Sequence, residues 1–287
     1  MKATRFLAIL FLFITPIASA QVTLKFNPEE GANYIYQLES KQNINTQMPN
    51  NNSMSVTMDI NFIWDMVILK KTQTESEIQI IYSDILFLID SPLMKVEYSS
   101  AIDLENLNEH EKMLKDAFEP MIGKPITITI TADGKVTSVK GTEGMFNQAG
   151  NVNIGVGFDE NSIKDIFEQS FNLYPEKPVN IDDSWDIPLN INMSGMSMAV
   201  NSTYTLKSVE DGVADIYVTS DIDSTIETNG DNAMTITFSG TQKGSIEMDV
   251  KTGIPTSSNI TQSIRGTLPN DIIMNITSDV KTLIKKK

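Results

Sequence analysis

The sequence predicts a mainly β (α+β) protein, in which long antiparallel strands form one or more curved sheets, half-barrel or barrel-like, together with two helices. Three observations favour this fold class. Apolar and polar residues alternate over long stretches, Asp-Gly and similar turn signals separate these stretches, and two segments instead carry apolar residues at helical spacing. Strands much longer than about five or six residues need strong twist and coiling, which is typical of barrels and large curved sheets.

The longest predicted strand runs from Met54 to Ile68, where every second residue is apolar. Its other face begins polar, with Ser55 and Thr57, and then becomes mixed. One end of this strand is therefore expected to face water on one side, and the other end to be covered on both. Shorter alternating runs predict further strands at 34–38, 126–130, 136–139, 185–191, 204–209, 213–222, 246–250 and 272–284.

Short turn sequences join several of these runs into hairpins. Asp133-Gly134 joins the runs at 126–130 and 136–139, and Asp211-Gly212 joins those at 204–209 and 213–222. Gly253 ends the turn that follows the run at 246–250 and leads into a strand ending near Ile264. Glycine after aspartate between alternating runs is a strong hairpin signal, because such turns need a positive φ.

Two segments carry helical periodicity. Apolar residues from Leu104 to Met121 recur at helical spacing and predict one helix, and Ile163–Phe171 predicts a second. The glycine-rich stretch 141–157 between them has no clear period and is expected to be a long connection.

The two halves of the chain share a short match that suggests an internal duplication. Leu69-Lys70 and Leu206-Lys207 lie 137 residues apart, and Ser83-Asp84-Ile85 and Ser220-Asp221-Ile222 have the same separation. The duplication is a hypothesis that the sheet register can test.

The first twenty residues have the three-part pattern of a secretory signal peptide. Lys2 and Arg5 form a basic start, an apolar run follows, and Ala18 and Ala20 occupy the positions that a signal peptidase reads. The mature chain is expected to begin at Gln21, with no transmembrane anchor after processing, and to be soluble in the periplasm or outside the cell. The expected organisation is a signal peptide (1–20), a β-rich half with one helix (21–140), a Gly-rich connection and helix (141–177) and a second β-rich half (178–287).

Composition excludes several classes of function. The chain has no cysteine, so disulfides, thiol chemistry and cysteine-bound metals are excluded. Without Lys2 and Arg5 the chain has 22 − 2 = 20 basic and 37 acidic residues, a formal charge of −17, and such a surface repels nucleic acid. The sequence has neither a phosphate-binding Gly loop nor a dinucleotide fingerprint, and no cofactor is expected.

Candidate catalytic residues are few, and an enzyme is the less favoured interpretation. The single histidine, His110, lies among acids on the first predicted helix, where exposure to solvent is expected. Carboxylate pairs occur at Asp182-Asp183, at Asp221 and Asp223, and at Asp103 and Glu105, and they leave a hydrolase open as an alternative.

One methionine-rich segment is a weak candidate for a metal site. Met193, Met196 and Met198 lie around Gly195, and thioether clusters select Cu(I). Methionine is common throughout this chain and fills irregular cores and apolar pockets, which is the favoured interpretation here.

Three segments resemble a family of uncharacterised exported proteins from Bacteroidetes, known as a domain of unknown function. The segments are 31–36 (GANYIY), 133–136 (DGKV) and 178–185 (PVNIDDSW), in which Asp182 stands where the family commonly has Gly. The resemblance implies no activity and no catalytic residues. At the level of fold, the predicted arrangement is also similar to the half-barrel carriers of lipids and lipoproteins in the periplasm.

The leading hypothesis is a non-enzymatic binding protein of the cell envelope, in which a curved sheet surrounds an apolar cavity and the helices cover it. A Met- and Phe-rich lining suits a lipid or another apolar ligand. The alternative is a structural or protein-interaction module that binds an envelope protein through a loop such as Gly144–Gly157. The side chains expected to line the cavity are Met58, Phe62, Met66, Phe118, Phe167 and Phe171.

Overall fold

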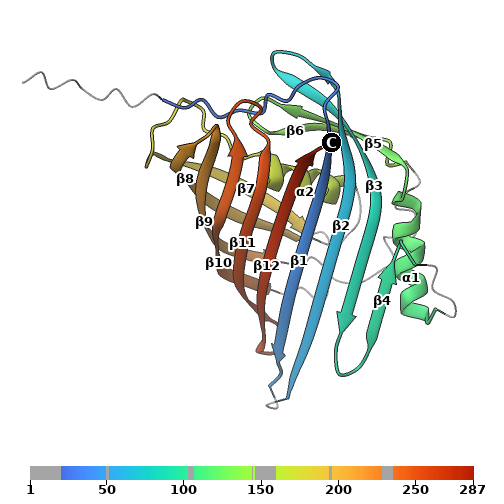
Figure 1. Ribbon diagram of the computed structural model, residues 1–287. Helices are drawn as coiled ribbons and strands as arrows, with labels where there is room; N and C mark the ends of the chain where they lie inside the picture. The colour runs from blue at the N-terminus through green and yellow to red at the C-terminus, as the bar shows by residue number, and fades with distance from the viewer. Residues whose placement is uncertain are drawn as a thin grey trace, which may run out of the picture.

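The computed structural model (Figure 1) describes residues 21–49, 52–102, 107–143, 145, 160–193, 196–227 and 235–287, with the backbone alone for 160–162, 190–193, 196–198, 226 and 227. Most of these residues belong to one curved antiparallel sheet, which confirms the predicted fold class. Its strands in chain order are β1 (Asn33–Gln47), β2 (Ser53–Lys71), β3 (Glu75–Asp90), β4 (Lys95–Ser99), β5 (Pro125–Thr131), β6 (Val136–Lys140), β7 (Ser184–Met193), β8 (Met196–Glu210), β9 (Val213–Glu227), β10 (Thr235–Asp249), β11 (Pro255–Leu268) and β12 (Ile272–Lys286).

The order of strands across the sheet is β6-β5-β3-β2-β1-β12-β11-β10-β9-β8-β7, with β4 paired to β3. The first and last strands of the chain, β1 and β12, are neighbours over almost their whole length, from Tyr34↔Lys286 to Gln47↔Ile273. This pairing joins the two β-rich halves into one sheet. The sheet curves into an open half-barrel, and its edge strands β6 and β7 do not pair with each other within the described residues (Figure 1).

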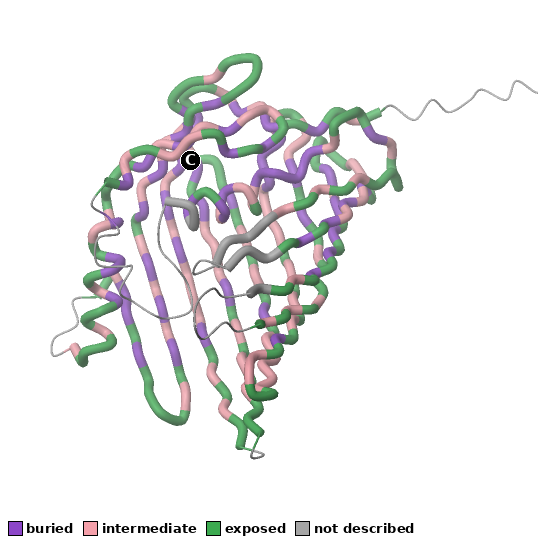
Figure 2. Tube along the Cα trace, turned by 180° about the vertical axis from the view of Figure 1, so that it is seen from behind, coloured by how far each residue is buried: buried purple, intermediate pink, exposed green. Residues whose placement is uncertain are grey.

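Alternation along the strands creates an inner and an outer face. Buried and half-buried residues alternate with exposed ones along most strands, as Figure 2 shows from the open side. Tyr34 and Tyr36 of β1 are buried, whereas Ile35 between them is exposed. The predicted turns are confirmed where Gly134, Gly212 and Gly253 adopt positive φ angles in the hairpins β5–β6, β8–β9 and β10–β11.

Helix α1 (Glu109–Phe118) is shorter than the predicted segment Leu104–Met121. The side chain of Asn108 accepts hydrogen bonds from the backbone N–H groups of His110 and Glu111, and this cap fixes the start of the helix at Glu109. A single 3₁₀ turn, η1 (Glu119–Met121), follows the helix. Residues 103–106 lie outside the described residues. His110 is exposed, as predicted.

Helix α2 (Glu160–Phe171) lies inside the curve of the sheet and contacts both edge strands, β6 and β7 (Figure 1). Its apolar residues Phe167 and Phe171 are fully buried, as the predicted helical stripe requires. The helix therefore covers the gap between the two open edges at one end of the half-barrel.

The segment before β1 crosses this same end of the sheet (Figure 1). The backbone N–H of Phe26 donates to the carbonyl oxygen of Ala132 at 2.9 Å, and that of Asn27 donates to Thr252 at 2.8 Å. Leu24 and Phe26 are both buried. The upper end of the half-barrel is thus covered by α2 and by this N-terminal segment.

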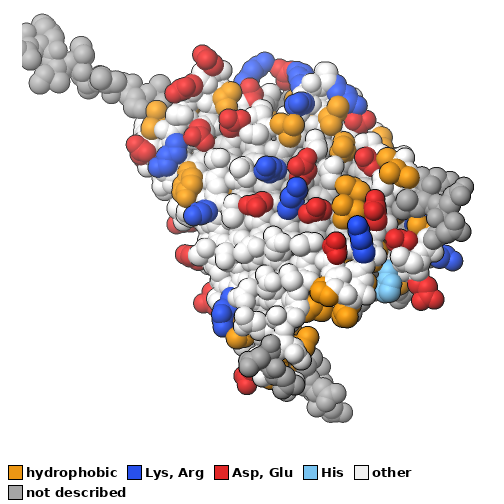
Figure 3. Space-filling view, turned by 60° about the horizontal axis from the view of Figure 1, so that its bottom comes forward, with side chains coloured by type: hydrophobic (Ala, Val, Ile, Leu, Met, Phe, Trp, Pro, Cys, Tyr) orange, Lys and Arg blue, Asp and Glu red, His pale blue; other side chains and the backbone are white. Residues whose placement is uncertain are grey.

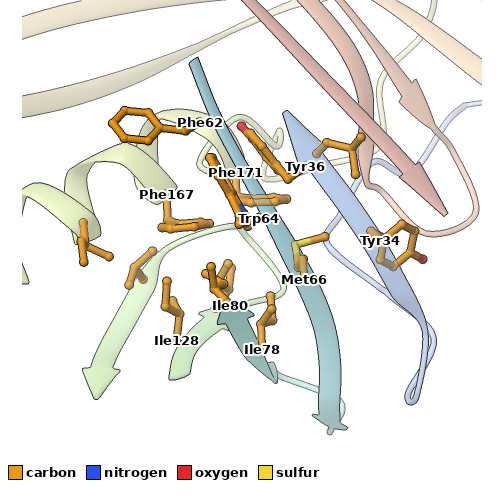
Figure 4. Close-up of a cluster of buried hydrophobic side chains, with 14 of the residues drawn as sticks. Tyr34, Tyr36, Phe62, Trp64, Met66, Ile78, Ile80, Ile128, Phe167 and Phe171 are labelled. Carbon is orange, nitrogen blue, oxygen red and sulfur yellow. The ribbon is translucent and has the colours of Figure 1, made fainter. Parts of the chain in front are cut away.

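An aromatic core fills the upper part of the half-barrel (Figure 4). Tyr36 of β1 stacks on Trp64 of β2 with ring centroids 4.0 Å apart, and Trp64 meets Phe167 of α2 edge-on at 5.8 Å. Phe118 of α1 packs against Phe62 at 6.2 Å. Both helices are therefore held to the inner face by buried aromatic pairs.

The sheet register does not support the sequence match between the two halves. At a separation of 137 residues, Leu69 matches Leu206, but Leu69 is 41% exposed and Leu206 is fully buried. The bulges after Ile68 in β2 and after Leu206 in β8 fall 206 − 68 = 138 residues apart. Because a shift of one residue exchanges the two faces of a strand, the matched residues are not structurally equivalent.

Candidate functional site

The inner face of the sheet from β1 through β12 to β8 is uncharged. The even-numbered residues face inward in β1, in β10, in β11 from Ser258 to Leu268 and in β12 up to Ile284. The same holds for Val200–Leu206 of β8 and Ala214–Ser224 of β9. None of these inward positions with a described side chain is Asp, Glu, Lys, Arg or His. The next even-numbered residue of β12, Lys286 opposite Tyr34, is charged and pairs with Glu29 at the covered end of the sheet. By contrast, charged side chains of both signs are scattered over the outer surface (Figure 3).

One row of polar side chains crosses this uncharged face. Each member lies directly opposite the next on the neighbouring strand, from β8 to β1. This set, called the polar row below, consists of Ser202, Ser220, Gln242, Gln262, Ser278 and Gln42.

Hydrogen bonds connect the members of the polar row. The Ser278 hydroxyl donates to Gln262 Oε1 at 2.7 Å, and Gln262 Nε2 donates to Gln242 Oε1 at 2.7 Å. The hydroxyls of Ser202 and Ser220 share a hydrogen bond of 2.7 Å. At the other end, Gln42 Nε2 donates to Ser40 Oγ at 3.3 Å. The hydrogen bonds between members form two groups within the row, Ser202 with Ser220 and Gln242 with Gln262 and Ser278. The partly exposed amides still have hydrogen-bonding capacity.

A cavity of about 160 Å³ lies between α2 and the inner face of the sheet, and it includes part of the polar row. It is called the inner cavity below. Helix α2 contributes Ile166, Gln169 and Ser170, and the strands contribute apolar walls such as Val280 and Ile260. Its lining is thus mixed, with apolar side chains around a few polar groups, as is usual in small-molecule sites.

Below the polar row, toward the open end of the half-barrel, the inner face is apolar again. The next row in register, called the lower apolar row, contains Gly240 on β10 and otherwise aliphatic side chains. Those on β1, β2, β11 and β12 are partly exposed. The aliphatic members of the lower apolar row are Val200, Ile222, Ile264, Ile276, Ile44 and Val56.

Three glycines on the inner face lie at close contacts between or beside β10 and β11. A Cβ atom at Gly244 would collide with the carbonyl oxygen of Asn259 and would lie 2.8 Å from Ile260 Cδ1. A Cβ at Gly240 would lie 2.8 Å from the Cα of Ile264, and one at Gly266 would meet the Phe238 ring at 3.0 Å. At Gly240 and Gly244, strand β10 therefore approaches the backbone of β11 too closely for a residue with a side chain.

Two tyrosines at the inner cavity keep their protons at neutral pH. Burial raises the pKa of Tyr204 to about 12. Burial also raises the pKa of Tyr36, whose hydroxyl shares a hydrogen bond of 2.8 Å with Ser170 Oγ of α2. Both side chains therefore add uncharged hydroxyls to the cavity.

The six side chains predicted to line a pocket lie in the packed core instead of along the inner cavity. Phe118, Phe167, Phe171 and Met66 are essentially inaccessible, and Met58 and Phe62 retain less than a tenth of their surface. Only Met58 adjoins the polar row, directly opposite Gln42. The sequence analysis missed the lining on β8–β12 because Ser, Gln and Thr residues such as Ser202, Gln242 and Gln262 interrupt its apolar side chains and break the apolar alternation.

The other sequence candidates do not converge on a site. The backbone pairs Met193 with Met196 and Ile191 with Met198 in the β7–β8 hairpin, but the methionine side chains lie outside the described residues, as do Ala18, Ala20 and most of 144–157. Asp182 forms an exposed ion pair with Lys207 at 3.5 Å. Asp221 and Asp223 are on the outer face of β9.

The part of the chain that the structure describes shows neither a cluster of metal-binding side chains nor a helix that could span a membrane. There, no group of three or more His, Cys, Asp or Glu residues is placed to hold a metal ion. Neither of its helices is long and apolar enough to cross a membrane.

Comparison with known proteins gives a family and a fold. The profile of a family of unknown function, DUF6263, matches residues 73–255, which is more than half of the chain. No curated protein matches the sequence significantly. A structure that describes lipid–protein interactions in lipovitellin is similar over 90% of this chain, with a TM-score of 0.52 and 10% identity. The match covers 25% of the lipovitellin chain.

Two bacterial proteins give weaker matches. OccK7 (OpdD) of Pseudomonas aeruginosa has 6% identity, with 89% of this chain and 100% of that one covered and a TM-score of 0.26. An outer membrane channel of Pseudomonas putida F1 has 7% identity, coverage of 94% and 100%, and a TM-score of 0.20. Likenesses this low carry no argument about the present chain.

Proposed function

The chain belongs to DUF6263, a family of unknown function, and we propose that it is a non-enzymatic binding protein that holds a lipid or another apolar molecule against the inner face of its sheet. The observation that carries this proposal is the uncharged inner face, which forms one wall of the inner cavity under α2. Soluble proteins seldom leave a large, partly exposed apolar surface without a use for it.

The fold supports the same proposal. The similarity to lipovitellin extends over 90% of the chain and includes the curved sheet that carries the inner cavity. Lipovitellin interacts with lipid, and the present chain offers an apolar concave surface of the kind that such an interaction needs. The carboxylates of Asp182, Asp183, Asp221 and Asp223 do not line the inner cavity, and this favours binding over hydrolysis there.

A cavity-blocking variant tests the proposal. Val280 is partly exposed at the inner cavity, so Val280→Phe should fill space that an apolar molecule would occupy. Binding of pyrene, an uncharged fluorescent hydrocarbon, should weaken roughly tenfold, equivalent to about 1.4 kcal/mol. Ser263→Phe places the same ring on the outer face of β11 and should leave pyrene binding unchanged. Failure of the wild-type protein to bind pyrene would contradict the proposal.

We further propose that the protein is exported and acts in the periplasm or outside the cell. The support is the signal-peptide pattern with Ala18 and Ala20 before Gln21. N-terminal sequencing of the protein from its own host should begin at Gln21, and Ala20→Phe should leave the precursor unprocessed because the bulky ring does not fit the peptidase pocket. Intact Met1 on cytoplasmic protein would overturn this proposal and leave the binding proposal standing.

A further inference from the structure

We propose that the polar row binds the carbonyl group of an uncharged acyl lipid, an ester or an amide, while the hydrocarbon of that lipid lies against the apolar rows. This inference rests on the proposed function and narrows it from any apolar ligand to one chemical class. It follows from three features of the inner face, namely the direction of the hydrogen bonds, the absence of charge and the position of the apolar walls.

The hydrogen bonds run in one direction and leave a donor at their end. The Ser278 hydroxyl donates to Oε1 of Gln262. The amide nitrogen Nε2 of Gln262 in turn donates to Oε1 of Gln242. The amide nitrogen of Gln242 makes no hydrogen bond to the described residues, and Gln242 lines the inner cavity. The unused group is therefore an N–H donor, and its complement on a ligand is an acceptor such as a carbonyl oxygen.

The ligand group that accepts a hydrogen bond from Gln242 should be uncharged. A buried carboxylate or phosphate needs a positive partner, because transfer of an unpaired charge from water is very costly. Apart from Lys286 at the covered end of β12, which pairs with Glu29, the inward positions of β1 and β8–β12 with described side chains hold no Lys, Arg or His. The hydroxyls of Tyr36 and Tyr204 at the cavity are uncharged at neutral pH, since the ordinary pKa of tyrosine is already about 10 and burial raises it further. An ester or amide carbonyl meets this condition, whereas a fatty acid anion does not.

The surroundings of the polar row fit a hydrocarbon on both sides. Above it, Val218, Ile260 and Val280 line the inner cavity under α2. Below it, the lower apolar row continues toward the open end, and from Gln42 to Thr46 the β1 strand adds roughly 14 Å of length at about 3.4 Å per residue. A lipid whose carbonyl lies at the polar row would therefore place hydrocarbon on each side of the row.

Three probes of equal chain length test this inference on the wild-type protein, namely methyl oleate, oleate and 1-octadecene. Methyl oleate should bind roughly tenfold more tightly than 1-octadecene, the change expected from one hydrogen bond of about 1.4 kcal/mol. Oleate at neutral pH should bind more weakly than methyl oleate. Equal binding of methyl oleate and 1-octadecene, or tighter binding of oleate, would overturn the inference and leave the proposed function intact. Binding of none of the three would overturn both.

A matched pair of variants locates the effect. Gln242→Leu removes the donor and should reduce the preference for methyl oleate over 1-octadecene to about twofold or less, while 1-octadecene binds at least as well as before. Gln47→Leu makes the same change on the exposed outer face of β1 and should keep the full preference. An unchanged preference in Gln242→Leu would contradict the role of the polar row. If this variant did not fold, the three-probe comparison on the wild-type protein would still decide.

Discussion

Single glycines on the inner face of β10 determine how closely this strand approaches β11. At Gly244, a Cβ atom would collide with the Asn259 carbonyl oxygen and crowd Ile260. We expect Gly244→Ala to reduce the free energy of unfolding by about 1–3 kcal/mol, the usual cost of overpacking. Urea denaturation measures this change, with Ser245→Ala on the outer face as the control. A Gly244→Ala protein as stable as the wild type would show that the two strands can separate without cost.

Asp182 has a backbone conformation that favours glycine. Its φ angle is 68°, and it lies in the turn where related sequences are expected to carry Gly. Asp182→Ala should lower stability by about 1 kcal/mol, because a left-handed conformation costs roughly 1–2 kcal/mol for most residues. Asp182→Gly should be no less stable than the wild type. Lys207→Ala removes the exposed ion pair with Asp182 but leaves the backbone conformation of Asp182 as it is. This control should change stability by about 0.5 kcal/mol or less.

At the scale of elements, one exposed carboxylate connects three segments. Glu29 of the N-terminal segment accepts from Lys251 of the β10–β11 turn at 2.7 Å and from Lys286 of β12 at 2.8 Å. The hydrogen bond from Lys251 contributes most, and together with the bond from Lys286 it lowers the pKa of Glu29 from 4.5 to about 2. The pairs therefore hold the N-terminal segment to the ends of two other elements.

The lowered pKa of Glu29 predicts a pH dependence. A carboxyl group whose pKa is lower in the folded state stabilises the fold above its unfolded pKa, and this stabilisation is lost as the pH falls. The stability difference between the wild type and Glu29→Gln should be constant above pH 4.5 and shrink between pH 4.5 and about 2. Thermal unfolding across this range measures it, and Glu210→Gln serves as an exposed control. A difference independent of pH would refute the role of these ion pairs.

Helix α2 is attached to the sheet mainly by two buried phenylalanines. Phe167 packs edge-on against Trp64 and stacks in parallel with Phe171 at 6.3 Å. Phe167→Ala should destabilise the protein by about 3–5 kcal/mol, as expected for the loss of a buried aromatic side chain. Gln169→Ala, at an exposed position of the same helix, should cost less than about 0.5 kcal/mol in the same urea titration.

At the scale of the whole molecule, the sequence predicted the fold class but only part of the topology. The strong alternation in β2 predicted a long strand, since each inward residue there is apolar. In β10 it predicted only the final residues from Ile246, because Gly240, Gln242 and Gly244 occupy inward positions. The pairing of β1 with β12 is a contact between distant parts of the chain, and no local pattern encodes it.

The same limit applies to the candidate site. Apolar periodicity identifies side chains that fill the core. The residues predicted to line a pocket, such as Met66, Phe118 and Phe167, are core residues of this kind. The lining of the inner cavity also includes polar residues such as Ser202, Gln242 and Gln262, which apolar periodicity does not select. These residues become a site only when the strands are placed in register.

The central claim is that the inner face holds an uncharged lipid, and native mass spectrometry of the protein purified from its own host tests it most directly. We expect a mass above that of the polypeptide alone, and extraction with organic solvent should release a neutral acyl ester or amide. The Val280→Phe protein should carry less of this lipid, and the Ser263→Phe protein should carry as much as the wild type. A wild-type mass equal to that of the bare chain, with no lipid in the extract, would contradict the account.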